Sequence, residues 1–311
     1  MQHLTNAKNL GDKDTNMSSL NFTENEVAEE IQSIIEFIRA QAEPDRHLLV
    51  GLSGGLDSDV TARLCVRAVS SQRIKCFTVL QDEFDPRHLQ NARNLAEDLG
   101  IDLVEIPFPH VPKQLITIMA EADPEIGFLP DGLLDVARSK CSIRTFIFSA
   151  YAERGYLVVG PSNRTELELG YFLPFGDGLS HLSPIAHLYK TQVQQLAPEL
   201  GTREEVIAQP PSAGFWIGDQ DLEGIAYWLY NGGPIKVDLN LNDQADAEVH
   251  NIFEQLSFKA LDEALLGINE GQDASLLVER SGLGPSIIQQ LQRLLYQSGL
   301  YKRRQLGARI Q

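Results

Sequence analysis

The chain has 311 residues, 43% of them hydrophobic, which fits one large domain or two small ones with an ample core. Its 26 basic and 43 acidic residues give a formal net charge of −17, which argues against nucleic-acid partners and against binding to anionic membranes. Because no stretch resembles a signal peptide or an 18-residue apolar span, we expect a cytoplasmic protein without a membrane partner.

The first half of the chain alternates between strand-like and helical patterns. Residues 1–20 are polar and aperiodic, which predicts a disordered arm. The expected strands are residues 48–52, 74–80, 101–107 and 156–160. The expected helices are residues 21–42, a segment that includes residues 60–65, and residues 86–99, 112–122 and 133–154. This alternation predicts an α/β fold with a doubly wound, mainly parallel sheet.

Beyond residue 201 the pattern becomes mainly helical. Two adjacent prolines predict a loop at residues 209–214. The expected helices are residues 219–231, 245–266 and 286–299, which would form a helical C-terminal cap on the α/β core. We therefore expect a single domain over residues 21–304, followed by a short tail at 305–311.

A glycine-containing loop follows the first strand, where residues 53–58 read SGGLDS. Two glycines let the backbone approach a ligand closely, and free N–H groups at a helix start favour an anion. Ser53 and Ser58 can add hydroxyl donors, whereas Asp57 suits a phosphate site only if a cation such as Mg²⁺ lies between them. The simpler alternative is a capped helix after a glycine turn.

The loop is not a Walker A motif, which requires a Gly-Lys-Ser/Thr ending. It resembles the PP-loop, Ser-Gly-Gly-x-Asp-Ser, of the ATP pyrophosphatases. That resemblance implies an adenine-nucleotide α-hydrolase-like fold, ATP and Mg²⁺ as cofactors, and cleavage of ATP between its α and β phosphates with adenylation of a substrate. It also implies that Ser53, Gly54, Gly55, Asp57 and Ser58 bind ATP.

Five further segments narrow the resemblance to the ammonia-dependent NAD synthetase family. In order and spacing the similar segments are residues 160–167 (GPSNRTEL), 170–172, 176–178, 184–193 and 210–214. The similarity extends from about residue 22 to residue 304. It implies that the proline-containing loop, within residues 205–225, is a mobile lid that closes over the site and excludes water.

The family resemblance implies a role for each matching residue. Glu166 would complete the Mg²⁺ site with Asp57, and Lys190 would bind a phosphate or the charge that develops at the α-phosphorus. The implied catalytic residues are Asp57, Lys190 and Ser212, and the further ATP-binding residues are Arg144, Thr165 and Lys190. The implied substrate-binding residues are Lys140, Ser142, Phe172, His181, Lys302 and Arg303. Taken singly, Glu166 could instead be a carboxylate in the first turn of a helix, and Lys190 could be a surface lysine. Lys302 and Arg303 could be basic residues that complement the dipole at a helix end.

The implied reaction has two steps. A substrate carboxylate attacks the α-phosphorus and releases pyrophosphate, and ammonia then converts the acyl adenylate into an amide and AMP. In this family the carboxylate belongs to nicotinic acid adenine dinucleotide. The resemblance also implies a homodimer, formed through the long helices. We expect no glutaminase domain in this chain, so that ammonia would come from solution or from a separate glutaminase partner.

Two departures from the family pattern leave other functions open. Ser142 stands where an arginine is expected, and His181 where an acidic residue is common. These changes favour a related amide synthetase that acts on another carboxylate in a specialised pathway, with His181 in the acyl pocket. Alternatively, Cys141 is a candidate nucleophile for sulfur transfer, because Arg138, Lys140 and Arg144 could lower its pKa. An inert buried thiol and a non-catalytic nucleotide-binding protein are the remaining alternatives.

Overall fold

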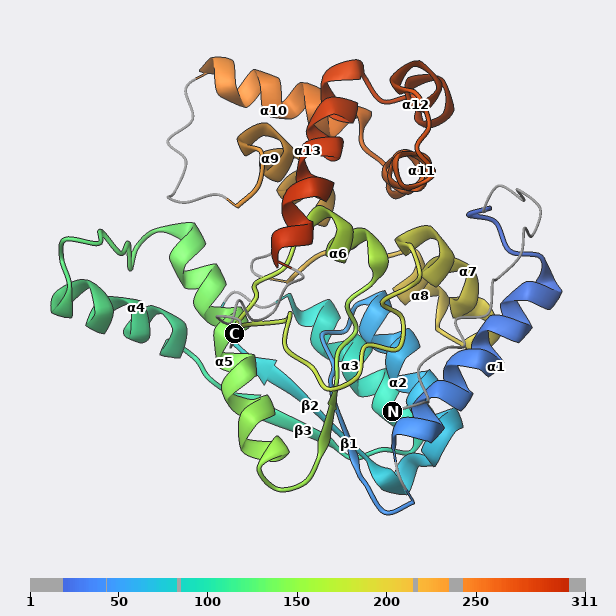
Figure 1. The fold of residues 1–311 in the computed structure, drawn as a ribbon. Helices are drawn as coiled ribbons and strands as arrows, with labels where there is room; N and C mark the ends of the chain where they lie inside the picture. Colours follow the sequence, from blue (N-terminus) through green and yellow to red (C-terminus); the bar gives the residue numbers. More distant parts are fainter. Residues whose placement is uncertain (1–18, 43, 83–84, 215–217, 235–242, 302–311) are drawn as a thin grey trace, which may run out of the picture.

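The computed structural model describes residues 19–42, 44–82, 85–214, 218–234 and 243–301 (Figure 1). Within these residues one sheet has the strand order β3-β2-β1-β4, and every pairing in it is parallel. The strands are β1 (Leu48–Gly51), β2 (Ile74–Leu80), β3 (Leu103–Pro107) and β4 (Leu157–Val159). The predicted parallel α/β fold is therefore confirmed, and the central strands β1 and β2 are almost fully buried.

Helices cover both faces of the sheet, as expected for a doubly wound fold. Leu48 and Val50 of β1 pack in one apolar cluster with residues of α1 (Glu24–Gln41), α2 (Leu56–Val69), α3 (Pro86–Leu99) and α7 (Lys190–Leu200). Leu49 points to the opposite face and packs with Ile147 of α5 (Leu133–Ala152). The alternation of side chains along one buried strand thus places a helical layer on each side.

Local capping signals explain why several helices begin and end where the sequence predicts. Thr23 and Glu26 form a capping box at the start of α1, with Glu26 N–H donating to Thr23 Oγ1 at 3.3 Å. Asp85 caps α3 and accepts the N–H of Arg87 at 2.9 Å, and Gly100 ends this helix in the left-handed conformation.

The C-terminal helices form the predicted cap, which has its own apolar cluster (Figure 1). Its helices are α9 (Asp221–Asn231), α10 (Asp243–Gln255), α11 (Phe258–Asn269), α12 (Ala274–Ser281) and α13 (Pro285–Tyr301). The expected single helix over residues 245–266 is wrong, because Ser257 begins a new helix by accepting the N–H of Ala260 at 3.1 Å. Helix α12 had no counterpart among the expected helices.

Three further α-helices complete the described set. They are α4 (Val111–Ala122), α6 (Arg164–Leu169) and α8 (Glu204–Ile207). Residues 1–18 and 302–311 lie outside the described residues, so the disordered arm, the tail and the domain bounds stay predictions. None of the described helices is both long enough and apolar enough to cross a membrane.

Candidate active site

The predicted PP-loop joins the end of β1 to the first residue of α2. Gly54 has a φ of 76°, and a Cβ atom built there would lie 2.0 Å from the carbonyl oxygen of His88 on α3. Only glycine therefore fits this position without moving the α3 backbone. The two serines tie the loop together: Ser58 Oγ lies 3.1 Å from Ser53 Oγ and donates to the carbonyl of Gly55 at 2.9 Å.

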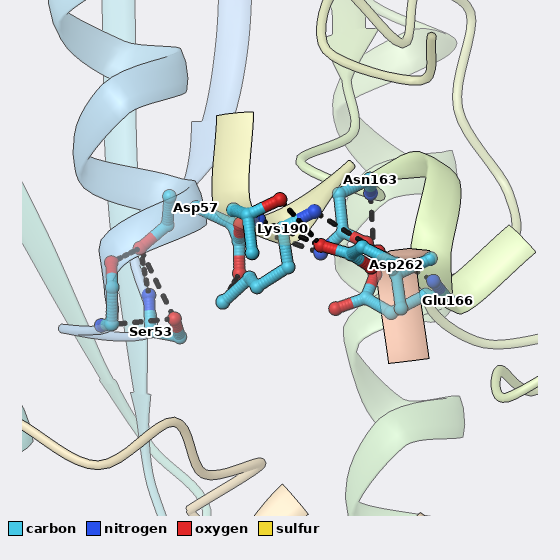
Figure 2. A network of polar contacts seen from close by, with 10 residues as sticks. Ser53, Asp57, Asn163, Glu166, Lys190 and Asp262 are labelled. Atoms are coloured by element: carbon cyan, nitrogen blue, oxygen red, sulfur yellow. Dashed lines mark hydrogen bonds and ion pairs between the residues drawn. The ribbon is translucent and has the colours of Figure 1, made fainter. Parts of the chain in front are cut away.

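Asp57 lies in the first turn of α2 and forms an ion pair with Lys190, the first residue of α7 (Figure 2). Lys190 is only 2% exposed, so its ammonium group depends on this partner. Asn163 Nδ2 donates to the other oxygen of Asp57 at 3.4 Å. Burial acts to lower the pKa of Lys190, but the nearby charges of Asp57 and Glu166 outweigh it and raise that pKa, which keeps the side chain cationic.

Glu166 combines a structural role with a place in this charged cluster. It completes a capping box at the start of α6, where its own N–H donates to Asn163 Oδ1 at 3.0 Å. Burial and the negative charge of Asp57 raise the pKa of Glu166, while Lys190 acts in the opposite direction. Figure 2 shows Lys190 between Asp57 and Glu166 in that view. Glu166 is thus a carboxylate in the first turn of α6 and lies in the charged cluster as well, so the two interpretations of this residue do not exclude each other.

The two carboxylates suit a hard divalent cation that is also held by a substrate. Mg²⁺ is usually bound by one or two carboxylates together with phosphate oxygens and water. Asp57 and Glu166 are close enough for the charge of one to disfavour ionisation of the other, which a shared cation would relieve. In the described part of the chain no group of three or more acidic, histidine or cysteine residues could hold a metal alone. The residues therefore fit an ion that binds with the nucleotide.

The proline-containing loop lies against the PP-loop. Residues 209–212 line a narrow cleft together with Gly55 and Leu56. Asn91 of α3 links the two loops: its Nδ2 donates to the carbonyl of Gly54 at 3.1 Å and to Gln209 Oε1 at 2.8 Å. Ser212 Oγ accepts the N–H of Gly214 at 2.9 Å. The loop thus occupies the place expected of a lid, and its mobility stays a prediction.

Asp221, the first residue of α9 and part of the predicted lid within residues 205–225, adds another acidic group to the cluster. Burial raises its pKa to about 7, and Lys190 acts to lower it. Asp219 and Asp57 raise it further through their charges. No role in the site was predicted for Asp221 from the sequence. Several carboxyl groups thus face one ammonium group, an arrangement that favours a bound cation.

Thr165 has a structural role that the resemblance did not imply. Its hydroxyl is buried, donates to Asp262 Oδ1 at 2.5 Å and accepts the N–H of Lys190 at 2.9 Å. Its predicted contact with ATP stays a prediction. Asp262, on α11 of the cap, was missed, although an acidic residue between Leu261 and Leu265 on an apolar helix is a recognisable signal.

The predicted acyl-binding residues contact different parts of the chain. Lys140 is buried and donates to the carbonyl of Asp82 at 3.1 Å, whereas Ser142 is exposed on the same helix. His181 is exposed, and its Nδ1 accepts the N–H of Val158 at 3.0 Å.

Three more residues complete the predicted set. The ring of Phe172 lies so close to Gly178 that a Cβ atom there would be 2.8 Å from it. Lys302 and Arg303 lie outside the described residues. The acyl-binding roles of all these residues stay predictions.

Cys141 does not have the electrostatics expected of a reactive thiol. It is 4% exposed, and burial raises the pKa of its thiol to about 12. Arg144 donates to its sulfur at 3.8 Å and acts to lower that pKa, but burial and the charge of Asp177 outweigh it. The net pKa of Cys141 is therefore raised, and not lowered as its basic neighbours had led us to expect. The buried-thiol alternative describes the structure better.

Comparison with known proteins identifies the family of this chain. The model of the NAD synthase family matches residues 29–231. The chain belongs to the NAD synthase family. It is 34% identical over 196 residues to an NH(3)-dependent NAD(+) synthetase of Methanocaldococcus jannaschii, covering 62% of this chain and 74% of that protein. It is 38% identical over 179 residues to the same enzyme of Carboxydothermus hydrogenoformans, covering 56% and 70%.

Solved structures show the same fold at lower sequence identity. An NMN synthetase of Francisella tularensis aligns with a TM-score of 0.67 and 20% identity, covering 93% of this chain and 99% of that one. An NH3-dependent NAD synthetase of Campylobacter jejuni aligns with a TM-score of 0.64 and 20% identity, covering 92% and 99%. The family resemblance and the fold are thereby confirmed. The fold similarity also includes the helical cap beyond residue 231, where the family match ends.

The crowding at Gly54 yields a test of the PP-loop. We expect Gly54→Ala to weaken ATP binding roughly 100-fold, since a displaced loop costs about that much for ångström-scale misplacement. Gly127→Ala is the matched control, because Gly127 has a similar φ of 78° but no atom within 4 Å of the added Cβ. It should lose only about 1–2 kcal/mol of stability. Calorimetric titration measures the affinity of each variant for ATP. Equal losses of ATP affinity in Gly54→Ala and Gly127→Ala would contradict the role given to crowding at Gly54.

Proposed function

We propose that this protein is an ATP-dependent carboxylate–ammonia ligase that converts nicotinic acid adenine dinucleotide into NAD, AMP and pyrophosphate. The observation that carries the proposal is the convergence of Asp57, Glu166 and Lys190 beside a glycine loop at the carboxyl edge of a parallel sheet. Membership of the NAD synthase family and the names of its relatives support the same reaction.

The PP-loop would bind the phosphates of ATP. The N–H groups at the start of α2 and the positive end of its dipole favour an anion in the loop. Ser53 and Ser58 add hydroxyl donors beside them. Asp57 and Glu166 would hold Mg²⁺ against the phosphate oxygens. When bound, the ion would neutralise the charge of the departing pyrophosphate.

Lys190 would stabilise the transition state at the α-phosphorus. A substrate carboxylate oxygen attacks this phosphorus while its bond to the bridging oxygen of the β-phosphate breaks, and pyrophosphate leaves. The ammonium group of Lys190 would stabilise the negative charge that develops on the α-phosphoryl oxygens, and Asp57 already holds this group in place. Since Lys190 is buried, little water competes for its charge.

The second step requires that the acyl adenylate react with ammonia and not with water. Ammonia attacks the acyl carbon, AMP leaves, and a proton leaves the nitrogen as the amide forms. The loop at residues 209–212 lies beside Gly55 and Leu56 and would shield the adenylate. Ammonia would come from solution or from a separate glutaminase.

Amidation of a different carboxylate is the competing function. The missing arginine at Ser142 removes a bidentate partner for an anionic group, and Ser142 is exposed on α5. Sulfur transfer by Cys141 is less well supported, because a thiol with a pKa of about 12 forms little thiolate at neutral pH. Ammonia is therefore the favoured second substrate.

Product analysis tests the reaction directly. The protein is incubated with ATP, Mg²⁺, ammonium and nicotinic acid adenine dinucleotide, and we expect NAD and AMP in equal amounts by mass spectrometry. Cys141→Ala should keep this activity within about twofold, since no step requires the thiol. Glutamine in place of ammonium should give no product without a glutaminase.

Other outcomes would redirect the proposal. ATP binding without NAD, but with amidation of nicotinic acid mononucleotide or another carboxylate, would favour the competing substrate. ATP binding without pyrophosphate release from any carboxylate would indicate a non-catalytic nucleotide-binding protein. Loss of activity in Cys141→Ala, with an unchanged melting temperature, would restore the sulfur-transfer alternative.

We also propose that two copies of this chain form a homodimer through α4 and α5. Large apolar side chains are exposed on α4 at the spacing of one helical face: Leu115 (43%), Ile118 (61%) and Met119 (44%). Phe146 of α5 is 69% exposed, and α4 packs against α5. Exposed apolar patches of this kind are typical of protein interfaces.

Sedimentation velocity tests the dimer. We expect the unmodified protein to sediment as a dimer and Ile118→Glu to shift it toward monomer, because a charge on this face would be buried at the interface. Tyr296→Glu, at an 80% exposed position on α13, is the matched control and should leave the dimer intact. A monomeric unmodified protein, or dissociation caused by both variants, would contradict the proposed interface.

A further inference from the structure

Helix α7 begins with Lys190, and its N-cap residue is Tyr189. The N–H of Tyr189 donates to Gln192 Oε1 at 3.0 Å, but the Tyr189 side chain makes no capping bond, so the first amides of the helix need other acceptors. The N–H groups of Gln192 and Val193 both bond to the carbonyl of Tyr189 at 2.9 Å. The N–H groups of Lys190 and Thr191 are the two that remain.

Side chains from two other helices accept these two N–H groups. The N–H of Lys190 donates to Thr165 Oγ1 of α6 at 2.9 Å. The N–H of Thr191 donates to Asp262 Oδ2 of α11 at 2.9 Å, and the hydroxyl of Thr191 donates to the same oxygen at 2.8 Å. Since Thr165 donates its own proton to Asp262 at 2.5 Å, one carboxylate organises both supports (Figure 2).

Burial of the Asp262 carboxylate is energetically unfavourable without hydrogen-bond partners. Asp262 is fully buried among the apolar residues of the cap, where an ionised carboxylate is unfavourable unless donors surround it. Three donors from Thr165 and Thr191 meet this need. Phe258, one turn earlier on α11, places its ring 5.6 Å from Lys190 Nζ. Helix α11 therefore lies beside the ammonium group of Lys190 and, through Thr165 and Thr191, supports the first turn of α7.

We propose that Asp262 is a positioning residue for adenylation: from the helical cap it fixes the first turn of α7 and thereby the place of Lys190 beside Asp57. This inference rests on the proposed function, because it assigns Lys190 to the α-phosphoryl group. It makes the cap part of the active site, although residue 262 lies beyond the family match at residues 29–231. A solely structural Asp262 would anchor the cap without affecting the chemical step.

Asn269 supplies a matched control at the same interface. It is the last residue of α11, and its Nδ2 donates to Glu168 Oε1 at 2.9 Å and to the hydroxyl of Tyr189 at 3.2 Å. These bonds also join α11 to α6 and α7, but they do not hold the N–H of Lys190 or Thr191. Asn269→Ala therefore loosens the cap without releasing the first turn of α7.

Steady-state kinetics with ATP, ammonium and nicotinic acid adenine dinucleotide separate the two roles. We expect Asp262→Asn to lower kcat at least about tenfold with little change in KM for ATP, because Lys190 acts in the transition state. Asp262→Ala should lose more, since it keeps no acceptor for the N–H of Thr191. Asn269→Ala should keep kcat within about twofold even where its melting temperature falls as far. Equal kcat losses in Asp262→Asn and Asn269→Ala, or an unchanged kcat in Asp262→Asn, would overturn the proposal.

A measurement without any substrate separates this inference from the proposed function. Hydrogen exchange, followed by mass spectrometry on peptides that contain the start of α7, should be faster in Asp262→Asn than in Asn269→Ala. If the unmodified protein makes no NAD but this difference appears, the proposed substrate fails and the support of α7 stands. If NAD forms but exchange at α7 is the same in both variants, the positioning role is wrong.

Discussion

The ion pair between the buried Lys190 and the partly buried Asp57 is the interaction on which the site depends. A buried ammonium group without a partner costs several kcal/mol, so Lys190 can be buried only beside this carboxylate. The pair joins the first turns of α2 and α7, which come from distant parts of the chain. It also places a cation and a carboxylate at the carboxyl edge of β1, where parallel sheets bind ligands.

The other features of the site support this pair from three directions. Gly54 lets the PP-loop pass against α3 without a clash, and Asn91 connects that loop to the lid. Glu166 adds a second carboxylate while it caps its own helix. Asp262, on the cap, accepts the N–H of Thr191, the residue after Lys190. The proposed site for phosphates and a divalent cation thus depends on ordinary capping and packing interactions, with charges of opposite sign held close together.

Sequence patterns predicted the elements whose signals are local and failed where the decisive contacts are distant. Residues 74–80 and 86–99 were placed to the residue, because Asp85, Pro86 and Gly100 mark the helix ends directly. The break at Ser257 was missed, since apolar periodicity continues across it. Asp262 was missed because its partners are 71 and 97 residues away. The pKa of Cys141 was misjudged because neighbouring charges can be read from a sequence, whereas burial cannot.

The proposed reaction joins a carboxylate oxygen of the substrate to the α-phosphorus of ATP. Nicotinic acid adenine dinucleotide labelled with ¹⁸O in its carboxylate tests it most directly, with the AMP from one turnover analysed by mass spectrometry. Attack by the carboxylate leaves one labelled oxygen on the phosphate of AMP when ammonia displaces the acyl group. AMP that carries ¹⁸O is the predicted result, and unlabelled AMP formed alongside NAD would contradict the account.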